Sequence, residues 1–376
     1  MLKTRYAWIA AALLSLLVLA WALPHRTPTA ALTYGTPNVQ SMGALAFGPD
    51  NLLLVGDSKS ASVFALEVND QAQAADNEPV TLSDVDKKIA ALLGTTPDAV
   101  TIHDMAVHPV SQQIYLSLTR GRGEDAMPVL LRIAKDGTMD EVSLDGIHFS
   151  QASITNAPDV DAKDRRGRSL RTNAITDLAY ADGQVYVAGL SNEEFASNFR
   201  RLAFPFKDQM EATSLEIFHV AHGRYETHAP VRTFMPYSIA GEPNILAAYT
   251  CTPLVAFPVD KLEDGTHVKG KTVAELGWGN TPLDVLSFEN GGKKRILIAN
   301  TNRTVMMIDA DDLPGAASLT EPLAEGAMTD GVDYLSLPLT GVLQMAMLND
   351  EHFLILQRQS QDGSLRLRSF SLSRML

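Results

Sequence analysis

Short apolar strands alternate along the body of the chain with turns rich in glycine, asparagine and aspartate. The first example is a strand over residues 44–47, a turn over 48–51 and a second strand over 52–55. Strands of this length bounded by such turns are the signature of β-hairpins. The unit recurs at intervals of roughly 60 residues, which indicates a repeat architecture. Its leading positions are Ala44, Asp104, Asp177, Tyr237, Asp284 and Gln344.

Six copies of such a meander predict sheets arranged radially around one axis. We therefore expect an all-β protein with a single six-bladed β-propeller. Seven blades are the alternative, because residues 214–220 and 224–234 could form a sheet of their own instead of outer strands of the third blade. The last strands, within residues 365–372, need a partner to close the ring. We expect the N-terminal segment 32–39 to supply it, which would leave no free sheet edge.

Three segments interrupt the repeat. Residues 83–93 have the apolar spacing of a helix, with Ser83 as its cap. Residues 157–173 are polar and rich in lysine and arginine, and residues 190–213 mix acids, aromatics and two adjacent arginines. Both of these predict loops. Loops of this length on a compact domain are more often functional than idle, although structureless surface loops are the alternative.

The N-terminus has the pattern of an export signal. Lys3 and Arg5 precede an apolar run over residues 6–23, and small-x-small motifs end at Ala22 and Ala31. The run is also close to the length of a membrane span, so an uncleaved single-pass anchor is the alternative. We expect a signal peptide or anchor over residues 1–31 and the propeller over residues 32–376. The protein is then periplasmic or secreted.

Charge and cysteine content exclude several classes of function. The 376 residues include 31 Lys and Arg against 44 Asp and Glu, a formal net charge of −13. A nucleic-acid partner is not expected, because phosphate binding needs a basic face. The single cysteine, Cys251, excludes an intrachain disulfide and any site built from several thiolates. The only membrane contact expected is through the N-terminal segment.

The leading positions suggest chemistry at the axis, because innermost strands begin around one mouth of the central channel. Three of these positions are the carboxylates Asp104, Asp177 and Asp284. Converging carboxylates repel one another and have raised pKa values unless a cation compensates. Their oxygens suit Ca²⁺ or another divalent cation, and the same side chains are candidate catalytic groups as general base or water-orienting residues. The alternative is that each aspartate caps its own turn through nearby backbone N–H groups.

Further candidates surround this set. Tyr237 and Gln344 lead inner strands, His103 precedes Asp104, and Asn280 precedes Asp284, so we expect all four to contribute to ligand binding. Cys251 is a candidate ligand-binding residue too, as a nucleophile with a base such as His103, a soft-metal ligand or a covalent attachment point. A buried small apolar side chain is the alternative.

Three histidines form a possible metal motif on the segment HVAHGRYETH. They are His219, His222 and His228. Strand alternation places the first two on opposite faces unless residues 221–223 form a turn, and their sequence is typical of one. A solvated outer hairpin is the alternative.

The blade pattern over about residues 40–376 resembles the extracytoplasmic six-bladed β-propellers of the NHL and SMP-30/gluconolactonase-like group. Lactonases of that group hold a divalent metal on the axis with a Glu, Asn and Asp set. Residues 279–282 followed by Asp284 are similar to one such segment. This chain departs from that ligand set, because no glutamate leads an inner strand and aspartate or glutamine leads several of them instead. The resemblance implies a divalent cation such as Ca²⁺ as cofactor.

Three functions remain open from the sequence. We expect an extracytoplasmic binding or scaffold protein that holds a small molecule or a periplasmic protein partner at the axial mouth and its loops. No P-loop, GxGxxG, HExxH, nucleophile elbow or CxxCH motif argues for a specific enzyme. The first alternative is a divalent-metal-dependent hydrolase of the lactonase or esterase type. The second is a propeller subunit of a periplasmic redox system, by analogy of fold and compartment. Whether the protein is an enzyme stays open.

Overall fold

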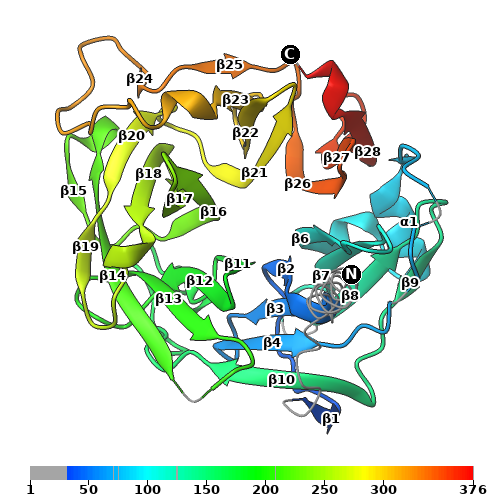
Figure 1. The fold of residues 1–376 in the computed structure, drawn as a ribbon. Coiled ribbons are helices and arrows are strands. Elements are labelled where there is room, and N and C mark those ends of the chain that lie inside the picture. Colours follow the sequence, from blue (N-terminus) through cyan, green and yellow to red (C-terminus); the bar gives the residue numbers. More distant parts are fainter. Residues whose placement is uncertain (1–31, 71, 75, 124–125, 208, 376) are drawn as a thin grey trace, which may run out of the picture.

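The computed structural model describes residues 32–70, 72–74, 76–123, 126–207 and 209–375. They form six β-sheets that stand around one axis (Figure 1), which confirms the predicted all-β, six-bladed propeller. The predicted signal peptide or anchor, residues 1–31, lies outside the described residues. Of the helices in the described part, none combines the length and apolar character that a membrane span needs.

We number the blades by the chain order of their innermost strands and give each from the axis outward. Blade 1 contains β2 (Leu45–Phe47), β3 (Leu53–Asp57), β4 (Ser62–Leu66), β10 (Ile147–Ser153) and β1 (Thr33–Gly35). Blade 2 contains β6 (Val100–Val107), β7 (Ile114–Arg120), β8 (Met127–Ile133) and β9 (Met139–Glu141). Blade 3 contains β11 (Asp177–Ala181), β12 (Gln184–Leu190), β13 (Ser197–Ala203), β14 (Met210–His219) and β15 (Arg224–Glu226), with β19 (His267–Lys269) parallel to β14.

The remaining blades follow the same scheme. Blade 4 contains β16 (Val231–Ile239), β17 (Glu242–Tyr249), β18 (Pro253–Pro258), β20 (Lys271–Glu275) and β24 (Asp330–Gly331). Blade 5 contains β21 (Pro282–Asn290), β22 (Lys293–Asn300), β23 (Met306–Asp309) and β25 (Tyr334–Ser336). Blade 6 contains β26 (Val342–Asn349), β27 (His352–Arg358), β28 (Leu365–Ser371) and β5 (Thr81–Leu82).

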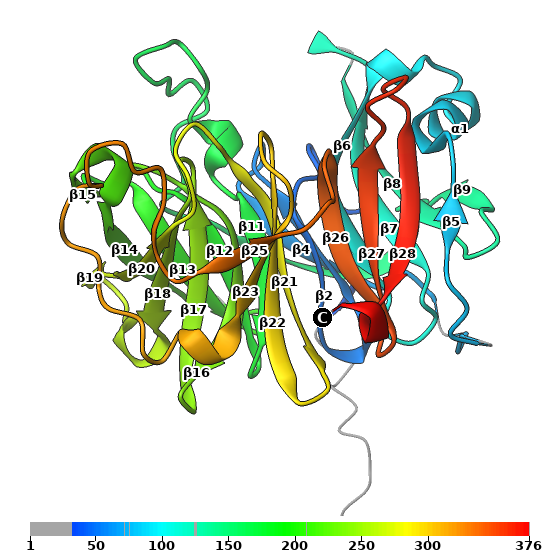
Figure 2. The same ribbon diagram turned by 90° about the horizontal axis from the view of Figure 1, so that it is seen from above.

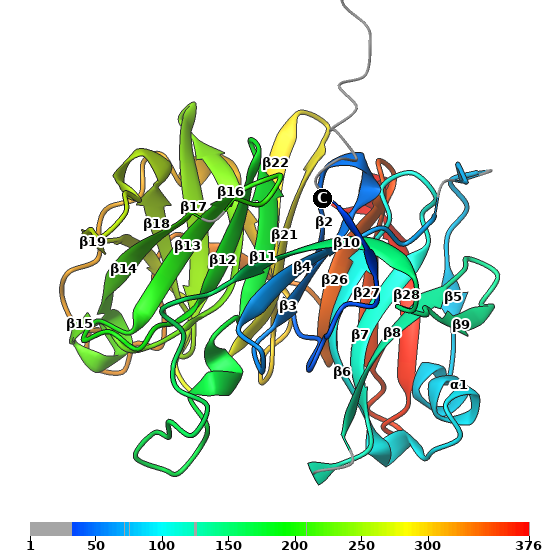
Figure 3. The ribbon, with the colours of Figure 1, turned by 90° about the horizontal axis from the view of Figure 1, so that it is seen from below.

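The blades do not follow one another around the ring in chain order. Strand β2 lies between β6 and β11, and β6 lies between β2 and β26, so the order around the axis is 2, 1, 3, 4, 5, 6. The chain leaves blade 1 after β4, builds blade 2 and returns along β10, which runs beside β4 (Figure 3). Blade 6 likewise receives its outermost strand, β5, from the first quarter of the chain.

The predicted closure of the ring was wrong. Strand β1 pairs with β10, with Tyr34 opposite His148, and β28 pairs with β5, with Leu367 opposite Leu82. The N-terminal segment belongs to blade 1, and blade 2 stands between blades 1 and 6. That segment therefore cannot reach the last strands, and β5 covers their edge instead.

The predicted insertions have mixed outcomes. Residues 157–173 form a loop, and the predicted helix is α1 (Val85–Leu92), whose N-cap is Asp84 and not Ser83. Residues 190–213 are not an insertion, because they contain β13 and the start of β14 of blade 3. Since β14 and β15 complete blade 3 and β16 is the innermost strand of blade 4, no seventh blade exists among the described residues.

The apolar core is divided among the six interfaces between neighbouring blades. One cluster of buried side chains fills each interface, for example Val55 of blade 1 with Tyr115 of blade 2. Burial in each cluster favours the ring by removing the facing surfaces of two sheets from water. Seen from the side, α1 and the green loop that precedes β11 project at the same end of the ring (Figure 2).

Candidate functional site

The register of the inner strands defines the positions that meet at the axis. Asp104 pairs opposite Ser117, Asp177 opposite Ala188, Asp284 opposite Ala299 and Gln344 opposite Leu356. A β-bulge directly precedes three of these positions, those of Asp104, Asp284 and Gln344. In blade 4 the same bulge precedes Thr233, opposite Ala248.

The prediction that Tyr237 leads blade 4 was therefore wrong. Tyr237 pairs opposite Asn244, further along β16, and packs against the core between blades 4 and 5. The strand begins well before the apolar-small-apolar stretch that suggested its start, so the true leading residue, Thr233, carried no distinctive signal. Tyr237 does not line the axial pocket described next.

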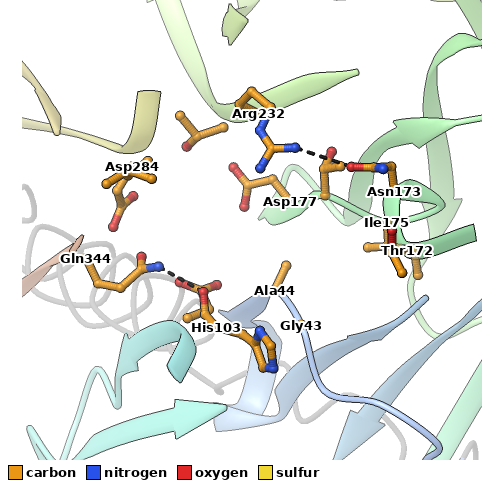
Figure 4. Close-up of a pocket in the computed structure, with 14 residues that line it drawn as sticks. Gly43, Ala44, His103, Thr172, Asn173, Ile175, Asp177, Arg232, Asp284 and Gln344 are labelled. Atoms are coloured by element: carbon orange, nitrogen blue, oxygen red, sulfur yellow. Dashed lines mark hydrogen bonds between the residues drawn. The ribbon is translucent and has the colours of Figure 1, made fainter. Parts of the chain in front are cut away.

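The leading positions line one pocket of about 210 Å³, which we call the axial pocket (Figure 4). Asp104, Asp177, Asp284, Gln344 and His103 all contribute to its wall, as the sequence predicted. Sequence reasoning missed a second group of lining residues. It comprises Thr233 and Arg232 of β16, and Thr172 and Asn173 at the end of the 157–173 loop.

Each axial aspartate joins two neighbouring blades. One carboxylate oxygen accepts a hydrogen bond from the next residue of its own strand, and the other accepts one from the inner strand of an adjacent blade. The donor pairs are Met105 and Leu45 for Asp104, Leu178 and Phe234 for Asp177, and Val285 and Met345 for Asp284, at 2.6–2.8 Å. The alternative interpretation from the sequence, in which each aspartate bonds a nearby backbone N–H, is borne out for the N–H of the next residue. The cross-blade bonds, which couple blades 2 and 1, 3 and 4, and 5 and 6, were not foreseen.

Burial dominates the electrostatics of these carboxyls. It raises the pKa of Asp104 to about 8, and the charge of Asp177 adds to that shift. Burial also raises the pKa of Asp177 to about 6. For Asp284, burial and then the charge of Asp104 raise the pKa well above its usual range. The backbone N–H donors oppose these shifts without cancelling them, so the pocket retains acidic protons near neutral pH.

The other polar side chains complete the wall. Gln344 donates from Nε2 to the carbonyl oxygen of His103 at 2.8 Å, and His103 Nε2 lies 2.7 Å from Thr119 Oγ1. Arg232 donates from Nη1 to Asn173 Oδ1 at 3.3 Å, and no described residue accepts from its buried Nε. Desolvation lowers the pKa of both His103 and Arg232.

Two other predicted residues lie away from the axial pocket. Cys251 lies in the turn between β17 and β18, whereas its proposed base His103 lines the pocket. Asn280 is 2% exposed, and its side chain bonds Asn300, Thr301 and Asn302. Its carbonyl oxygen accepts a 2.7 Å hydrogen bond from the N–H of Cys251. Asn280 therefore holds the turn that carries the cysteine.

The fold brings Cys251 to two of the three predicted histidines. Residues 220–222 form the expected turn, and one ligand atom each of His219, His222 and Cys251 lies within 4.8 Å of the other two. Among the described residues, the ligand atoms of this triplet lie close enough together to share one metal ion, whereas those of the three axial aspartates do not. His228 contacts Thr227 instead, at 3.1 Å.

Comparison with known proteins identifies no family. No protein-family model matches the chain, and no curated protein matches it. Among solved structures, one described as a putative oxidoreductase (glucose dehydrogenase) from Thermus thermophilus shares 12% identity over 90% of this chain and 100% of that one, with a TM-score of 0.36. The PQQ-bound form of an aldose sugar dehydrogenase from Streptomyces coelicolor shares 11% identity over 90% and 96%, with a TM-score of 0.32. At these TM-scores the similarity carries no argument about function.

Proposed function

We propose that the protein is a binding protein whose axial pocket takes a small polar ligand that carries positive charge. The observation that supports this most is the convergence of Asp104, Asp177 and Asp284 on one pocket of about 210 Å³, where burial raises all three pKa values. A cationic ligand would favour the ionised carboxylates and recover the cost of their desolvation.

The proposed ligand meets a mixed wall. Three acids face two bases, Arg232 and His103, so an excess of negative charge remains when all are ionised. Gln344 and Asn173 add amide groups that can orient hydroxyl or amine substituents. Each aspartate oxygen is already committed to one backbone N–H. An organic ammonium, or a divalent ion such as Ca²⁺ contacted through its water shell, therefore suits the pocket better than an ion bound directly by all three carboxylates.

Calorimetric titration tests this proposal with Ca²⁺, Mg²⁺ and a panel of small hydroxylated primary amines. We expect saturable binding of at least one probe at pH 8, with proton release and an affinity at least ~10-fold weaker at pH 5, because ligand and protons compete for the same carboxyls. Asp104→Asn should reduce this dependence, and Asp177 and Asp284 account for what remains. Asp182→Asn, in the turn at the other end of β11, is the matched control. Absence of binding by every probe at pH 8 would overturn the proposal.

A hydrolase is the second candidate, favoured by one observation. A carboxyl with a pKa of about 8, as burial gives Asp104, can exchange a proton close to neutral pH and so act as a general acid or base. Turnover of a lactone or ester panel that Asp104→Asn abolishes and Asp182→Asn retains would favour this candidate. A role in a periplasmic redox system and a location outside the cytoplasm stay predictions from the sequence.

A further inference from the structure

A second polar cluster lies where the outer part of blade 3 meets blade 4. His219 ends β14, His222 lies in the turn that follows, and Cys251 comes from the turn between β17 and β18. The three residues are brought together by the packing of two blades. This cluster shares no residue with the axial pocket and does not rest on the proposed function.

One carboxylate orients both imidazoles. Glu226 Oε2 lies 2.7 Å from His219 Nδ1, and Glu226 Oε1 lies 2.8 Å from His222 Nδ1. An ionised carboxylate can only accept, so Nδ1 of each ring carries a proton, and in the neutral ring Nε2 then presents a lone pair. Carboxylates hold metal-binding histidines in proteins in this way. Arg224 Nε also donates to Glu226 Oε1, at 3.0 Å, and so fixes the carboxylate itself.

The Nε2 atom of His219 supports an ion or molecule bound at this cluster. His219 is 2% exposed, and its buried Nε2 has no hydrogen-bond partner among the residues that the structure describes. Buried polar atoms in proteins nearly always have a hydrogen-bond partner or bind an ion. A buried acceptor without a protein partner therefore indicates a bound ion or molecule. A second buried polar atom of this kind, on Glu275, lies close by. Glu275 is fully buried, and its Oε2 accepts from the N–H of Ala221 between the two histidines. Within the described part of the chain, its Oε1 has no hydrogen-bond partner.

The turn that carries Cys251 is held in an unusual backbone conformation. Cys251 and Thr252 have φ angles of 67° and 61°, a region that residues other than glycine and asparagine seldom adopt. Two hydrogen bonds maintain it, from Cys251 N–H to Asn280 and from the Thr252 hydroxyl to the carbonyl of Gly277 at 2.8 Å. The fold thus fixes the position of the cysteine from both sides.

We propose that His219, His222 and Cys251 bind one zinc ion, with Glu226 as the positioning residue for both imidazoles. One thiolate and two imidazoles are a ligand set that zinc accepts, and three protein ligands leave its fourth tetrahedral position for water or a substrate. On binding, the thiol of Cys251 loses its proton to solvent and its sulfur forms the bond to zinc. The ion would satisfy Nε2 of His219 and bring positive charge toward Glu275.

Metal titration of the full-length protein tests this site. After dialysis against a chelator, we expect one equivalent of Zn²⁺ to bind in competition with a chromogenic chelator. Co²⁺ in its place should show the charge-transfer band of a thiolate ligand and the visible bands of tetrahedral coordination. Cys251→Ser should remove the charge-transfer band. Glu226→Gln should weaken Zn²⁺ binding by roughly 10–100-fold, as loss of an orienting carboxylate does at other metal sites.

The controls separate ligand loss from misfolding. His222→Gln changes a partly exposed ligand and should weaken Zn²⁺ binding, whereas His228→Gln, outside the cluster, should leave both affinity and spectrum unchanged. Each variant's circular dichroism should match that of the wild type without metal. Binding of less than one equivalent of Zn²⁺, a Co²⁺ spectrum without a thiolate band, or unchanged affinity in Cys251→Ser would overturn the proposal.

Discussion

The carboxylate of Asp284 on β21 accepts a 2.6 Å hydrogen bond from the backbone N–H of Met345 on β26, which ties blade 5 to blade 6. Asp177 makes the same contact with Phe234, and Asp104 with Leu45. Three carboxylates on alternate blades therefore couple all six blades in pairs. The side chains proposed to bind a ligand also hold the ring together.

Removal of one of these carboxylates should destabilise the ring. Asp284→Ala leaves the N–H groups of Val285 and Met345 without their acceptor, and unsatisfied buried donors cost about 1–3 kcal/mol each. Relief of charge repulsion offsets part of this loss. We expect the free energy of unfolding to fall by about 2–4 kcal/mol in urea denaturation. Asp161→Ala, at an exposed loop position, should change it by less than ~0.5 kcal/mol. A gain in stability for Asp284→Ala would contradict the cross-blade role.

The raised pKa values predict how stability depends on pH. A carboxyl in the unfolded chain titrates near pH ~4, whereas burial places Asp177 at about 6 and Asp104 at about 8. Between the unfolded and folded values, the native state holds a proton that the unfolded state has lost, so the free energy of unfolding falls as pH rises. This contribution is fully present below pH ~4. The part due to Asp177 is lost by about pH 6 and the part due to Asp104 by about pH 8.

Urea denaturation between pH 4.5 and 8.5 checks this dependence. The informative quantity is the difference between wild type and Asp104→Asn, because titrating groups that do not interact with Asp104 cancel in it. We expect the variant to gain stability relative to wild type as pH rises from 6 to 8, by up to about 1.4 kcal/mol per pH unit. A difference that is constant over this interval would show that Asp104 ionises at its ordinary pKa.

We expect Arg200 to stabilise the 157–173 loop, whose end lines the axial pocket. Its fully buried guanidinium donates to Asn156 Oδ1, to the carbonyl of Ala174 and to the carbonyl of Leu190, at 2.7–3.0 Å. The first two acceptors flank the 157–173 loop on either side. Arg200→Met leaves all three unsatisfied and should lower the free energy of unfolding by about 3 kcal/mol.

Limited trypsin digestion provides the local measurement. The loop is rich in lysine and arginine, so its opening is reported directly by cleavage within residues 157–173. We expect cleavage there to be roughly 10-fold faster in Arg200→Met than in wild type. The neighbouring Arg201 pairs with Glu211 near the surface, and Arg201→Met should cleave at the wild-type rate. Equal rates for the two variants would mean that Arg200 does not anchor the loop.

Replacement of Cys251 should increase the stability of the metal-free protein and remove its zinc binding. Asparagine tolerates a φ of 67° better than cysteine does, so Cys251→Asn should raise the free energy of unfolding of the metal-free protein by about 0.5–1 kcal/mol. Thermal unfolding with and without Zn²⁺ checks this. Zinc should stabilise the wild type and leave the variant unchanged. Zinc stabilisation of the variant would place the ion elsewhere.

The repeat was predictable because strand and turn chemistry is local. Asp104, Asp177, Asp284 and Gln344 were placed correctly at the axis, since each directly precedes the recognisable apolar stretch of its inner strand. Thr233 was missed because the most recognisable stretch of β16 lies further along the strand than the axial position, and Tyr237 was chosen in its place. Local patterns therefore locate strands better than they locate the first residue of a strand.

The pairing and packing between blades could not be predicted from a single sequence. Nothing in the residues of β5 or β10 specifies which sheet edge each will join, because an outer strand pairs through backbone groups that every sequence has. Cys251 and the His219–His222 pair were each recognised as candidate metal ligands, but the packing of blade 3 on blade 4 unites them. Glu226 was overlooked, although it lies four positions after His222 and close enough to bond it.

The distant strands that complete blades 1 and 6 bear on the order in which the chain can fold. Blade 1 lacks an outer layer until β10 has been synthesised, and β5 has no partner until the C-terminal strand β28 exists. When β28 docks, Ser369 Oγ accepts from the N–H of Val80, a residue 289 positions earlier. Strand β28 thus holds in place a segment that is translated far earlier, and deletion of β28 would leave β5 without its partner strand.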